Sequence, residues 1–298
     1  MDIYDEISFK TSKLITKKYS TSFSIAVSSL PKEMRESIYS IYGFVRLADE
    51  IVDTFHTINQ KLVLEDFERE YYKTLENGIS MNPVLQSFGI TVTKYHFPNE
   101  LVDSFLKSMK ADLSKQSYDN DTELESYIHG SANVVGLMCL LVFLDGDKVK
   151  FDELEESAMK LGSAFQKVNF LRDLKADTQE LNRLYFPDVD MDNFTEEVKY
   201  VLIKDIQNDF DEAEKGIREL PGKSKLAVYI AFLYYKKLLQ NLKNTPADKI
   251  AKTRIRVPDV TKFILLGKAY MKYRLNTIWI YDWWNKGREW DTCIHQLV

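Results

Sequence analysis

The stretch ADEIVDTF, Ala48 to Phe55, places Asp49 and Asp53 four residues apart in a segment that is otherwise rich in apolar residues. The stretch RDLKAD repeats this spacing with Asp173 and Asp177. Residues four apart share one face of an α-helix, where two like charges destabilise the helix by roughly 0.2–0.5 kcal/mol. A solvated acidic face is the ordinary explanation of a single pair. Two such pairs beside apolar residues favour a cation that both pairs bind.

Both aspartate pairs are expected to border the buried face of a helix. The first predicted helix begins after Pro31, a residue favoured at helix starts. One stripe of this helix carries a ring, a guanidinium group and two carboxylates, from Tyr42, Arg46, Asp49 and Asp53. In the second predicted helix, Leu161 to Asp177, one stripe carries Gln166, Asn169, Asp173 and Asp177. Apolar residues lie beside both stripes, so the acids do not lie opposite the apolar face.

The side chains around the aspartates suit one kind of ligand. Mg²⁺ prefers oxygen ligands, takes few carboxylates from the protein and completes its shell with water and substrate phosphates. Arg46 and Arg172 stand next to the acids, and a guanidinium group is well suited to binding phosphate oxygens. Carboxylates, magnesium and arginine together predict a clamp for a diphosphate group.

The composition excludes several classes of protein. The chain has 298 residues and a net charge of −5 without a Lys/Arg-rich run, so no nucleic-acid partner is expected. The two cysteines, Cys139 and Cys293, predict no disulfide framework, and both are expected to be reduced. The acidic N-terminal sequence lacks the apolar segment of a signal peptide. The longest apolar run, Val134 to Leu144, is shorter than the roughly 20 residues that span a bilayer, so we expect a buried helix and no membrane anchor.

The spacing of apolar residues predicts a single all-α domain over residues 1–298, with about ten helices. The prolines separate the helical patterns. The best strand candidate, Gly89 to Phe97, is interpreted as a loop or a helix end because Pro98 follows it. The charged run Asp209 to Leu220 predicts a solvated helix face. The four histidines are scattered without metal-ligand spacing, which disfavours zinc.

Four stretches together resemble one protein family. They are YSTSF (Tyr19–Phe23), YGFVRLADEIVD (Tyr42–Asp53), YIHGSANVVGLM (Tyr127–Met138) and LGSAFQKVNFLRDLKADTQELNRLYFP (Leu161–Pro187), with a weaker match through LPGKSKLAVYIAFLYYKKLL and RIRV. Over roughly residues 12–260 the chain resembles the squalene/phytoene synthases, the head-to-head prenyltransferases. A lone DxxxD pair is unspecific, whereas both pairs combined with QxxNxxRDxxxD and RxYFP are specific to this family.

The resemblance implies an isoprenoid-synthase helical bundle, in which the two aspartate helices face each other across a central apolar cavity. Mg²⁺ and diphosphate would be bound by Asp49, Asp53, Asn169, Asp173 and Asp177, and Mn²⁺ could replace Mg²⁺. Diphosphate oxygens would be bound by Arg46, Gln166 and Arg172, and in the weaker match by Tyr235 and Arg254. The substrate would be contacted by Ser22, Phe23, Tyr42, Tyr127 and Val135, and Tyr42 would join the four aspartates as a catalytic residue.

Three positions depart from the family pattern. Thr21 stands where many members have Lys, and Asn133 occupies the first Gly position of an AGTVG-type stretch. Ala176 stands where an acid often precedes the last Asp. These changes affect the expected details of diphosphate binding and leave the four aspartates in place.

The reaction that the resemblance implies is the Mg²⁺-dependent, head-to-head condensation of two geranylgeranyl diphosphates to 15-cis-phytoene in carotenoid biosynthesis, through prephytoene diphosphate. No NADPH is expected for this reaction. One alternative joins two farnesyl diphosphates to squalene or dehydrosqualene. A second is a non-catalytic relative, which would typically have lost a metal-binding aspartate. The third is a terpene cyclase or a chain-elongating transferase. The stretch ADEIVD matches the DDxxD motif of these enzymes only in part. Ala26 and Val27 are small, which predicts room for the longer prenyl chain.

The resemblance also sets expectations for partners and location. The expected partners are prenyl diphosphates, and the expected state is a cytoplasmic monomer or weak homodimer with peripheral membrane contact where a lipid product leaves. The C-terminal cluster of Trp279, Trp283, Trp284 and Trp290 is interpreted as helix packing, with a membrane-interface surface as the alternative.

Overall fold

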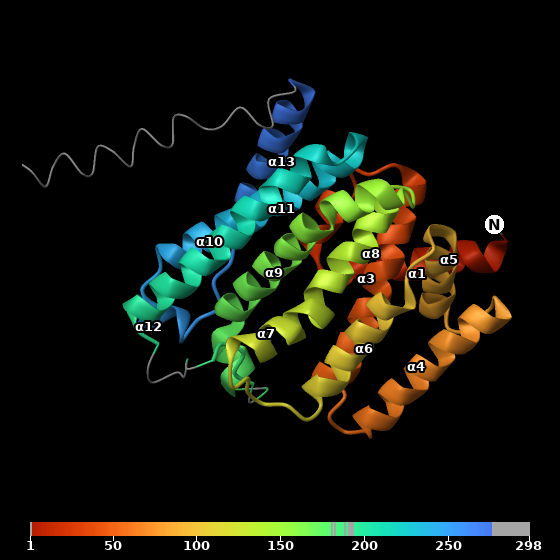
Figure 1. The fold of residues 1–298 in the computed structure, drawn as a ribbon, viewed down its shortest axis with the longest axis horizontal. Coiled ribbons are helices and arrows are strands. Elements are labelled where there is room, and N and C mark those ends of the chain that lie inside the picture. Colours follow the sequence, from red (N-terminus) through yellow and green to blue (C-terminus); the bar gives the residue numbers. More distant parts are fainter. Residues whose placement is uncertain (1, 180, 182, 188, 190–193, 276–298) are drawn as a thin grey trace, which may run out of the picture.

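The computed structural model describes residues 2–275 except 180, 182, 188 and 190–193, and most of these residues lie in helices (Figure 1). The elements are α1 (Ile3–Tyr19), α2 (Thr21–Val27), α3 (Lys32–Asp53), α4 (Gln60–Asn77), α5 (Pro83–Tyr95), α6 (Asn99–Asp112), α7 (Asp121–Ile128), a π-helical turn (His129–Asn133), α8 (Val134–Phe143), α9 (Lys148–Gln179), α10 (Glu196–Glu219), α11 (Gly222–Lys243), α12 (Ala247–Ile250) and α13 (Asp259–Arg274). The described part contains no strand, only an isolated bridge between Ser117 and Leu184. The predicted all-α class is confirmed.

The helices of the described residues are more numerous than the ten expected, because short elements such as α2 and α12 are too brief to show a helical repeat in the sequence. The C-terminal tryptophan cluster and Cys293 lie outside the described residues.

Local signals explain where helices begin and end. Asn82 caps α5 by accepting a hydrogen bond from the backbone N–H of Val84 at 3.0 Å, and Pro83 opens its first turn. His96 ends this helix in a left-handed conformation with a φ of 52°. The segment Gly89 to Phe97 is therefore mainly the end of a helix, which was one of its two predicted interpretations.

The long helix α9 lies at the centre of the molecule. In Figure 1 it runs between α8 and α10, and both helices pack against it. The first aspartate helix, α3, packs against α1, α5 and α8, and α2 packs against α11. Both aspartate helices therefore have α8 as a common neighbour.

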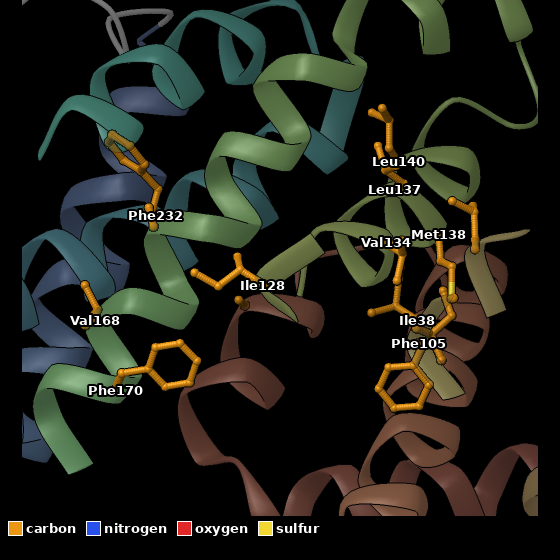
Figure 2. Packing of buried hydrophobic residues seen from close by; sticks show 14 of the residues in the cluster. Ile38, Phe105, Ile128, Val134, Leu137, Met138, Leu140, Val168, Phe170 and Phe232 are labelled. Atoms are coloured by element: carbon orange, nitrogen blue, oxygen red, sulfur yellow. The ribbon is translucent and has the colours of Figure 1, made fainter. Parts of the chain in front are cut away.

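Apolar side chains from α3, α6 and α8 fill the space between these helices. Figure 2 shows Ile38, Phe105, Val134 and Met138 gathered there, and each is at most 1% exposed. α7, the π-helical turn and α8 form one continuous helical segment, Asp121–Phe143, of 23 residues with a mean hydropathy of 1.5 in its most apolar window. By length and composition alone this segment could cross a membrane, but 50% of that window is buried inside the molecule, as in a core helix.

α9 approaches the π-helical turn closely because Gly162 has no side chain. A Cβ atom at this position would lie 2.9 Å from the carbonyl oxygen of Ala132 and 3.0 Å from the Cα atom of Asn133. Both are backbone atoms, so they move only if the turn moves. Gly162 therefore sets the separation between α9 and the segment that leads into α8.

One charged segment differs from its sequence-based prediction. The run Asp209 to Leu220 is not uniformly solvated, because Asp209 is only 3% exposed. Its carboxylate accepts hydrogen bonds from Lys160, Ser163 and Lys167 at 3.0, 2.7 and 2.8 Å. The prediction is wrong at this position because the partners lie on α9, and spacing within α10 does not show them.

The close approach at Gly162 predicts that Gly162→Ala destabilises the protein by about 1–3 kcal/mol, the usual cost of overpacking. The matched control is Gly267→Ala in α13, where a Cβ atom would meet nothing within 4 Å. This control should be neutral or stabilising by about 0.5–1 kcal/mol, because alanine favours the helix. Urea unfolding followed by circular dichroism measures both changes, and equal effects of the two substitutions would contradict the close packing of α9 on the turn.

Candidate active site

A cavity of about 900 Å³ lies between α2, α3, α8, α9, α10 and α11. Its volume is near the upper end of the roughly 300–1,000 Å³ that is typical of small-molecule pockets. A smaller hollow of about 340 Å³ lies beyond the end of α3 and is lined by residues that include Asp112 and Arg183. The larger cavity is therefore the main candidate for a ligand site in the described part of the chain.

The larger cavity has an apolar end and a polar end. Phe143, Leu154 and Ile217 line the apolar end. The polar end is lined by Arg46, Gln166, Asn169, Arg172 and Arg254. Leu154 and Arg172 lie on the same helix, and a rise of about 1.5 Å per residue over 18 residues separates them by about 27 Å. The length of α9 thus spreads the two kinds of lining along one axis.

Ten of the sequence-predicted site residues line this cavity. They are Ser22, Phe23, Tyr42, Arg46, Val135, Gln166, Asn169, Arg172, Tyr235 and Arg254. The four aspartates and Tyr127 are not among the lining residues. The aspartates lie on the same helices as two of the cavity arginines, Arg46 on α3 and Arg172 on α9, in the turns beside and beyond them. The chemical roles assigned to all these residues remain predictions.

Stacked aromatic rings form part of the wall near the polar end. The rings of Phe23 and Tyr42 stack with centroids 5.0 Å apart, and those of Phe165 and Tyr235 with centroids 3.9 Å apart. The Tyr235 hydroxyl donates a hydrogen bond to Asn169 Oδ1 at 3.3 Å. Burial raises the pKa of Tyr42 to about 12, so its ring carries a neutral hydroxyl at neutral pH. The wall thus offers uncharged, electron-rich rings.

The arginines at the polar end form two ion-paired groups. Arg46 pairs with Glu50, lies 3.8 Å from Asp49, and has its guanidinium carbon 4.3 Å from the centroid of the Tyr19 ring. Its buried Nε–H donor has no hydrogen-bond partner. Asp173 pairs with the adjacent Arg172, and Arg254 Nε lies 2.8 Å from the Oδ1 atom of Asp173. Arg46, Arg172 and Arg254 all line the cavity, so its polar end offers positive charge to an anionic ligand.

The aspartates of α3 and α9 act on one another through their charges. Burial, followed by the charge of Asp53, raises the pKa of Asp49 to about 7. Burial, followed by the charges of Asp173 and of Asp53, raises the pKa of Asp177 to about 7. Asp53 is on α3 and Asp177 is on α9. The structure therefore brings the two predicted acidic stripes close enough for their charges to interact.

Two residues that the sequence-based prediction missed join this acidic region. Arg183 Nη1 donates to Asp53 Oδ1 at 2.7 Å, and Arg183 Nη2 donates to the backbone carbonyl of Asp112 at 3.0 Å. The Asp112 carboxylate accepts a hydrogen bond from the Tyr127 hydroxyl at 2.9 Å. Arg183 is the arginine of RxYFP, so its motif was visible in the sequence without a role. Asp112 has no partner acid at helical spacing that would have marked it.

Tyr127 therefore lies in a different place from the cavity wall where it was expected. Its ring is 7% exposed and stacks on Tyr185, with centroids 5.5 Å apart. Its hydroxyl reaches Asp112 beside the acidic region, and residues of α8 occupy the cavity wall. The helix α7, which carries Tyr127, precedes the π-helical turn and contacts α9, and the Tyr127 ring also stacks on Phe170 of α9 with centroids 6.2 Å apart.

The acidic region has the donor chemistry that Mg²⁺ requires. Among the described residues no three His, Cys, Asp or Glu side chains converge to form a metal site by themselves. Mg²⁺, however, commonly takes one or two carboxylates from a protein and completes its shell with phosphate oxygens and water. The raised pKa values of Asp49 and Asp177 reflect buried negative charge that a divalent cation would neutralise. The residues present therefore fit the metal.

The environment of Asp112 predicts a pH-dependent destabilisation of the metal-free protein. Burial raises its pKa from 3.8 to about 7, so between these values the folded state holds a proton that the unfolded state has lost. Stability from this group therefore falls as the pH rises through that range. Relative to wild type, the free energy of unfolding of Asp112→Asn should increase from about pH 5 to about pH 8. Urea unfolding with EDTA measures this difference.

The matched control for this prediction is Asp211→Asn, which replaces an exposed carboxylate on α10. Its stability relative to wild type should stay nearly constant between the two pH values. A relative stability of Asp112→Asn that is constant or falls as the pH rises would contradict the buried, protonated carboxyl group.

Comparison with known proteins supports a single family. The family model for squalene/phytoene synthase matches residues 16–261. Phytoene synthase 1, chloroplastic, of Arabidopsis thaliana is 28% identical over 280 residues, which cover 88% of this chain and 66% of that protein. Phytoene synthase of Arthrospira platensis is 25% identical over 292 residues, which cover 90% of this chain and 94% of that protein. The chain thus spans about two thirds of the plant relative and most of the relative from Arthrospira.

The fold also has a match among solved structures. A crystal structure of a dehydrosqualene synthase in complex with a ligand has a TM-score of 0.79 and 24% identity, covering 91% of this chain and 98% of that one. At this identity the likeness concerns the all-helical fold. The matched range 16–261 contains both aspartate helices and every residue predicted for the site. On this evidence the chain belongs to the squalene/phytoene synthase family.

Proposed function

We propose that this chain is a phytoene synthase that joins two geranylgeranyl diphosphates head to head. The observation that carries the proposal is one cavity with Arg46, Arg172 and Arg254 at its polar end and a long apolar remainder. A prenyl diphosphate has the same division between an anionic head and an apolar tail. The relatives from Arabidopsis and Arthrospira are phytoene synthases, which favours this reaction within the family.

Magnesium is proposed to bind through the oxygens of Asp49, Asp53, Asn169, Asp173 and Asp177, with Mn²⁺ as a substitute. When bound, the ion would supply positive charge that stabilises a departing diphosphate. The proposal is supported by the effect that the charge of Asp53 on α3 has on the pKa of Asp177 on α9. No NADPH is proposed for this reaction.

The chain's own residues bind the heads and shelter the reacting carbons. Arg46, Arg172 and Arg254 line the cavity, where their guanidinium groups can bind diphosphate oxygens. The ring faces of Phe23 and Tyr42 lie at the cavity wall, where they stabilise positive charge on an allylic carbon. The apolar cavity excludes water, which would otherwise capture the cation.

The proposed reaction balances without an added reductant. In the first half, one prenyl chain loses diphosphate, and a double bond of the second chain attacks the resulting cation. One proton leaves and a cyclopropyl diphosphate forms. In the second half, the remaining diphosphate leaves, the ring rearranges, and a second proton leaves to yield the linear C40 product. A squalene synthase would instead add a hydride from NADPH in place of the second proton loss.

The second candidate is a dehydrosqualene synthase, because a solved structure of such an enzyme shares the fold at a TM-score of 0.79. The lining of the apolar end favours the longer C20 chain, since Ala26 and Val27 are small and line the cavity. A non-catalytic relative is disfavoured because the chain retains Asp49, Asp53, Asp173 and Asp177. Substrate length is thus the main distinction between the two enzymatic candidates.

A product assay tests the proposed reaction. Purified protein with Mg²⁺ should convert geranylgeranyl diphosphate to a C40 hydrocarbon without NADPH, and EDTA should stop the reaction because the acidic region loses its cation. Lipid extraction followed by chromatography and mass detection identifies the product. A C30 product from farnesyl diphosphate alone would assign the dehydrosqualene reaction, and no product from either substrate would contradict enzymatic function.

Three variants complete this assay. Asp49→Ala and Asp173→Ala should each lower turnover by at least about 100-fold, since several kcal/mol of charge stabilisation is lost. The matched control Asp211→Ala removes an exposed carboxylate from α10 and should retain wild-type turnover. Circular dichroism checks that all three variants keep their helical content. Full turnover in either aspartate variant would rule out the assigned metal ligands.

The depth of the apolar end yields a prediction about chain length. Val27 is 3% exposed and lines the cavity, so Val27→Phe should shorten the apolar end. The ratio of kcat/KM for the C20 substrate over the C15 substrate should fall by at least about tenfold, the effect of 1–3 kcal/mol of steric conflict. The control Val149→Phe, at a position 71% exposed, should leave the ratio unchanged. An unchanged ratio in Val27→Phe would show that this residue does not limit chain length.

A further inference from the structure

Arg183 makes hydrogen bonds to the C-terminal ends of three helices. Its backbone N–H donates to the carbonyl oxygen of Asp177 at 2.8 Å, near the end of α9. Its guanidinium group donates to the Asp53 carboxylate at the end of α3, at 2.7 Å, and to the carbonyl oxygen of Asp112 at the end of α6, at 3.0 Å. One residue therefore joins the last aspartate of each aspartate helix.

Two of these acceptors are groups that a helix leaves unsatisfied. The last four carbonyl groups of a helix have no partner within it, and those of Asp112 and Asp177 belong to this stretch of α6 and α9. Arg183 is 8% exposed, and the N–H groups of a guanidinium form a rigid fork. The position of Asp53 relative to α6 and α9 thus depends on the geometry of one buried side chain.

The surroundings of Arg183 are fixed by aromatic packing. Asp112 accepts a hydrogen bond from the Tyr127 hydroxyl at 2.9 Å, and the Tyr127 ring stacks on Tyr185 with centroids 5.5 Å apart. Tyr185, two residues after Arg183, also stacks on Phe170 of α9 with centroids 3.9 Å apart. These contacts restrict the chain on both sides of the guanidinium group, relative to α6 and to α9.

Arg183 differs from the arginines of the large cavity. Arg46, Arg172 and Arg254 line that cavity, whereas Arg183 lines only the smaller hollow beyond the end of α3. Its contact with the acidic region is the hydrogen bond to Asp53. A residue that bonds to a metal ligand without touching the metal fixes the orientation of that ligand. The arrangement of Arg183 corresponds to this role and not to the binding of an anion in the large cavity.

We propose that Arg183 is a positioning residue that holds Asp53 of α3 at a fixed separation from Asp177 of α9, so that the metal site is formed before a diphosphate binds. Its Nη1 atom engages Oδ1 of Asp53, which leaves Oδ2 for the cation. The inference deepens the proposed function and rests on it, because it takes both aspartates as ligands of a divalent cation.

The test is the binding of Mn²⁺ to the full-length protein in the presence of inorganic pyrophosphate, measured from the electron paramagnetic resonance signal of free Mn²⁺. Arg183→Lys keeps the positive charge but has a single nitrogen atom, so it cannot reproduce the fork between Asp53 and Asp112. The Kd of Mn²⁺ should rise at least about tenfold, the usual effect of losing a residue that orients a metal ligand. An unchanged Kd would overturn the proposal.

A pair of methionine variants separates positioning from stability. Lys199 is also a buried cation that ties helix ends, because it is 6% exposed and donates to the carbonyl oxygens of Lys243 and Thr245 at 3.4 and 2.8 Å. Both Arg183→Met and Lys199→Met should lower the midpoint of urea unfolding. Only Arg183→Met should weaken Mn²⁺ binding, and Lys199→Met should change the Kd by less than about twofold. Equal weakening in both variants would show a purely structural role and contradict the proposal.

A double-mutant cycle tests whether Arg183 acts through Asp53. Asp53→Ala removes the carboxylate that Arg183 holds, so adding Arg183→Lys to this variant should raise the Kd of Mn²⁺ by less than about twofold. The same substitution in the wild type should have its full effect. If the effect of Arg183→Lys is equal in both backgrounds, Arg183 acts independently of Asp53 and the proposal is wrong.

The product assay separates this inference from the proposed reaction. If Mn²⁺ binding depends on Arg183 as expected but the wild type forms no C40 product, the positioning role stands and the proposed function is wrong. If the wild type forms the product and Arg183→Lys binds Mn²⁺ as the wild type does, the proposed function stands and the positioning role is wrong.

Discussion

The central constraint on this fold is the partial burial of several carboxylates close together at the ends of α3 and α9. Burial and mutual repulsion hold the pKa values of Asp49 and Asp177 near 7. Such a region is unfavourable unless positive charge is near, and the surrounding structure supplies it in part. Arg46, Arg183 and Arg254 each reach an aspartate of the region, and they come from three separate parts of the chain.

The positive charge that the protein supplies is unevenly distributed. Arg183 ties Asp53 to the backbone of Asp112, which fixes the end of α3 against the end of α6. Arg46 lines the cavity together with Arg172 and Arg254. The acids are thus paired with Arg183 on the side of α6, while these three arginines lie at the cavity. This is the arrangement that an anionic substrate with a divalent cation would complete.

The length and packing of α9 place this charged region beside the polar end of a long cavity. Early turns of the helix line the apolar end, and later turns line the polar end. Gly162 in the middle of the helix lets it lie against the backbone of the π-helical turn. Asp209 on α10 reaches across to Lys167 and fixes α9 from the other side. These contacts hold α9 against both of its neighbours along the length of the cavity.

Much of this molecule was determined by the sequence alone. Helical periodicity predicted the all-α class and placed Asp49, Asp53, Asp173 and Asp177 beside apolar stripes, because these signals are local. The family resemblance, and not the periodicity, implied that the two aspartate helices face each other. Motif spacing also identified the family that the comparison later established.

Other features were decided only by the tertiary structure. Asp112 and Arg183 join the acidic region from distant segments, and Tyr127 turns to Asp112 and away from the cavity. Asp209 is buried by partners on another helix, contrary to the charge pattern of its own segment. Such contacts depend on how helices pack against one another. A residue's neighbours across the bundle leave no periodic signal in the chain, so only the folded arrangement reveals them.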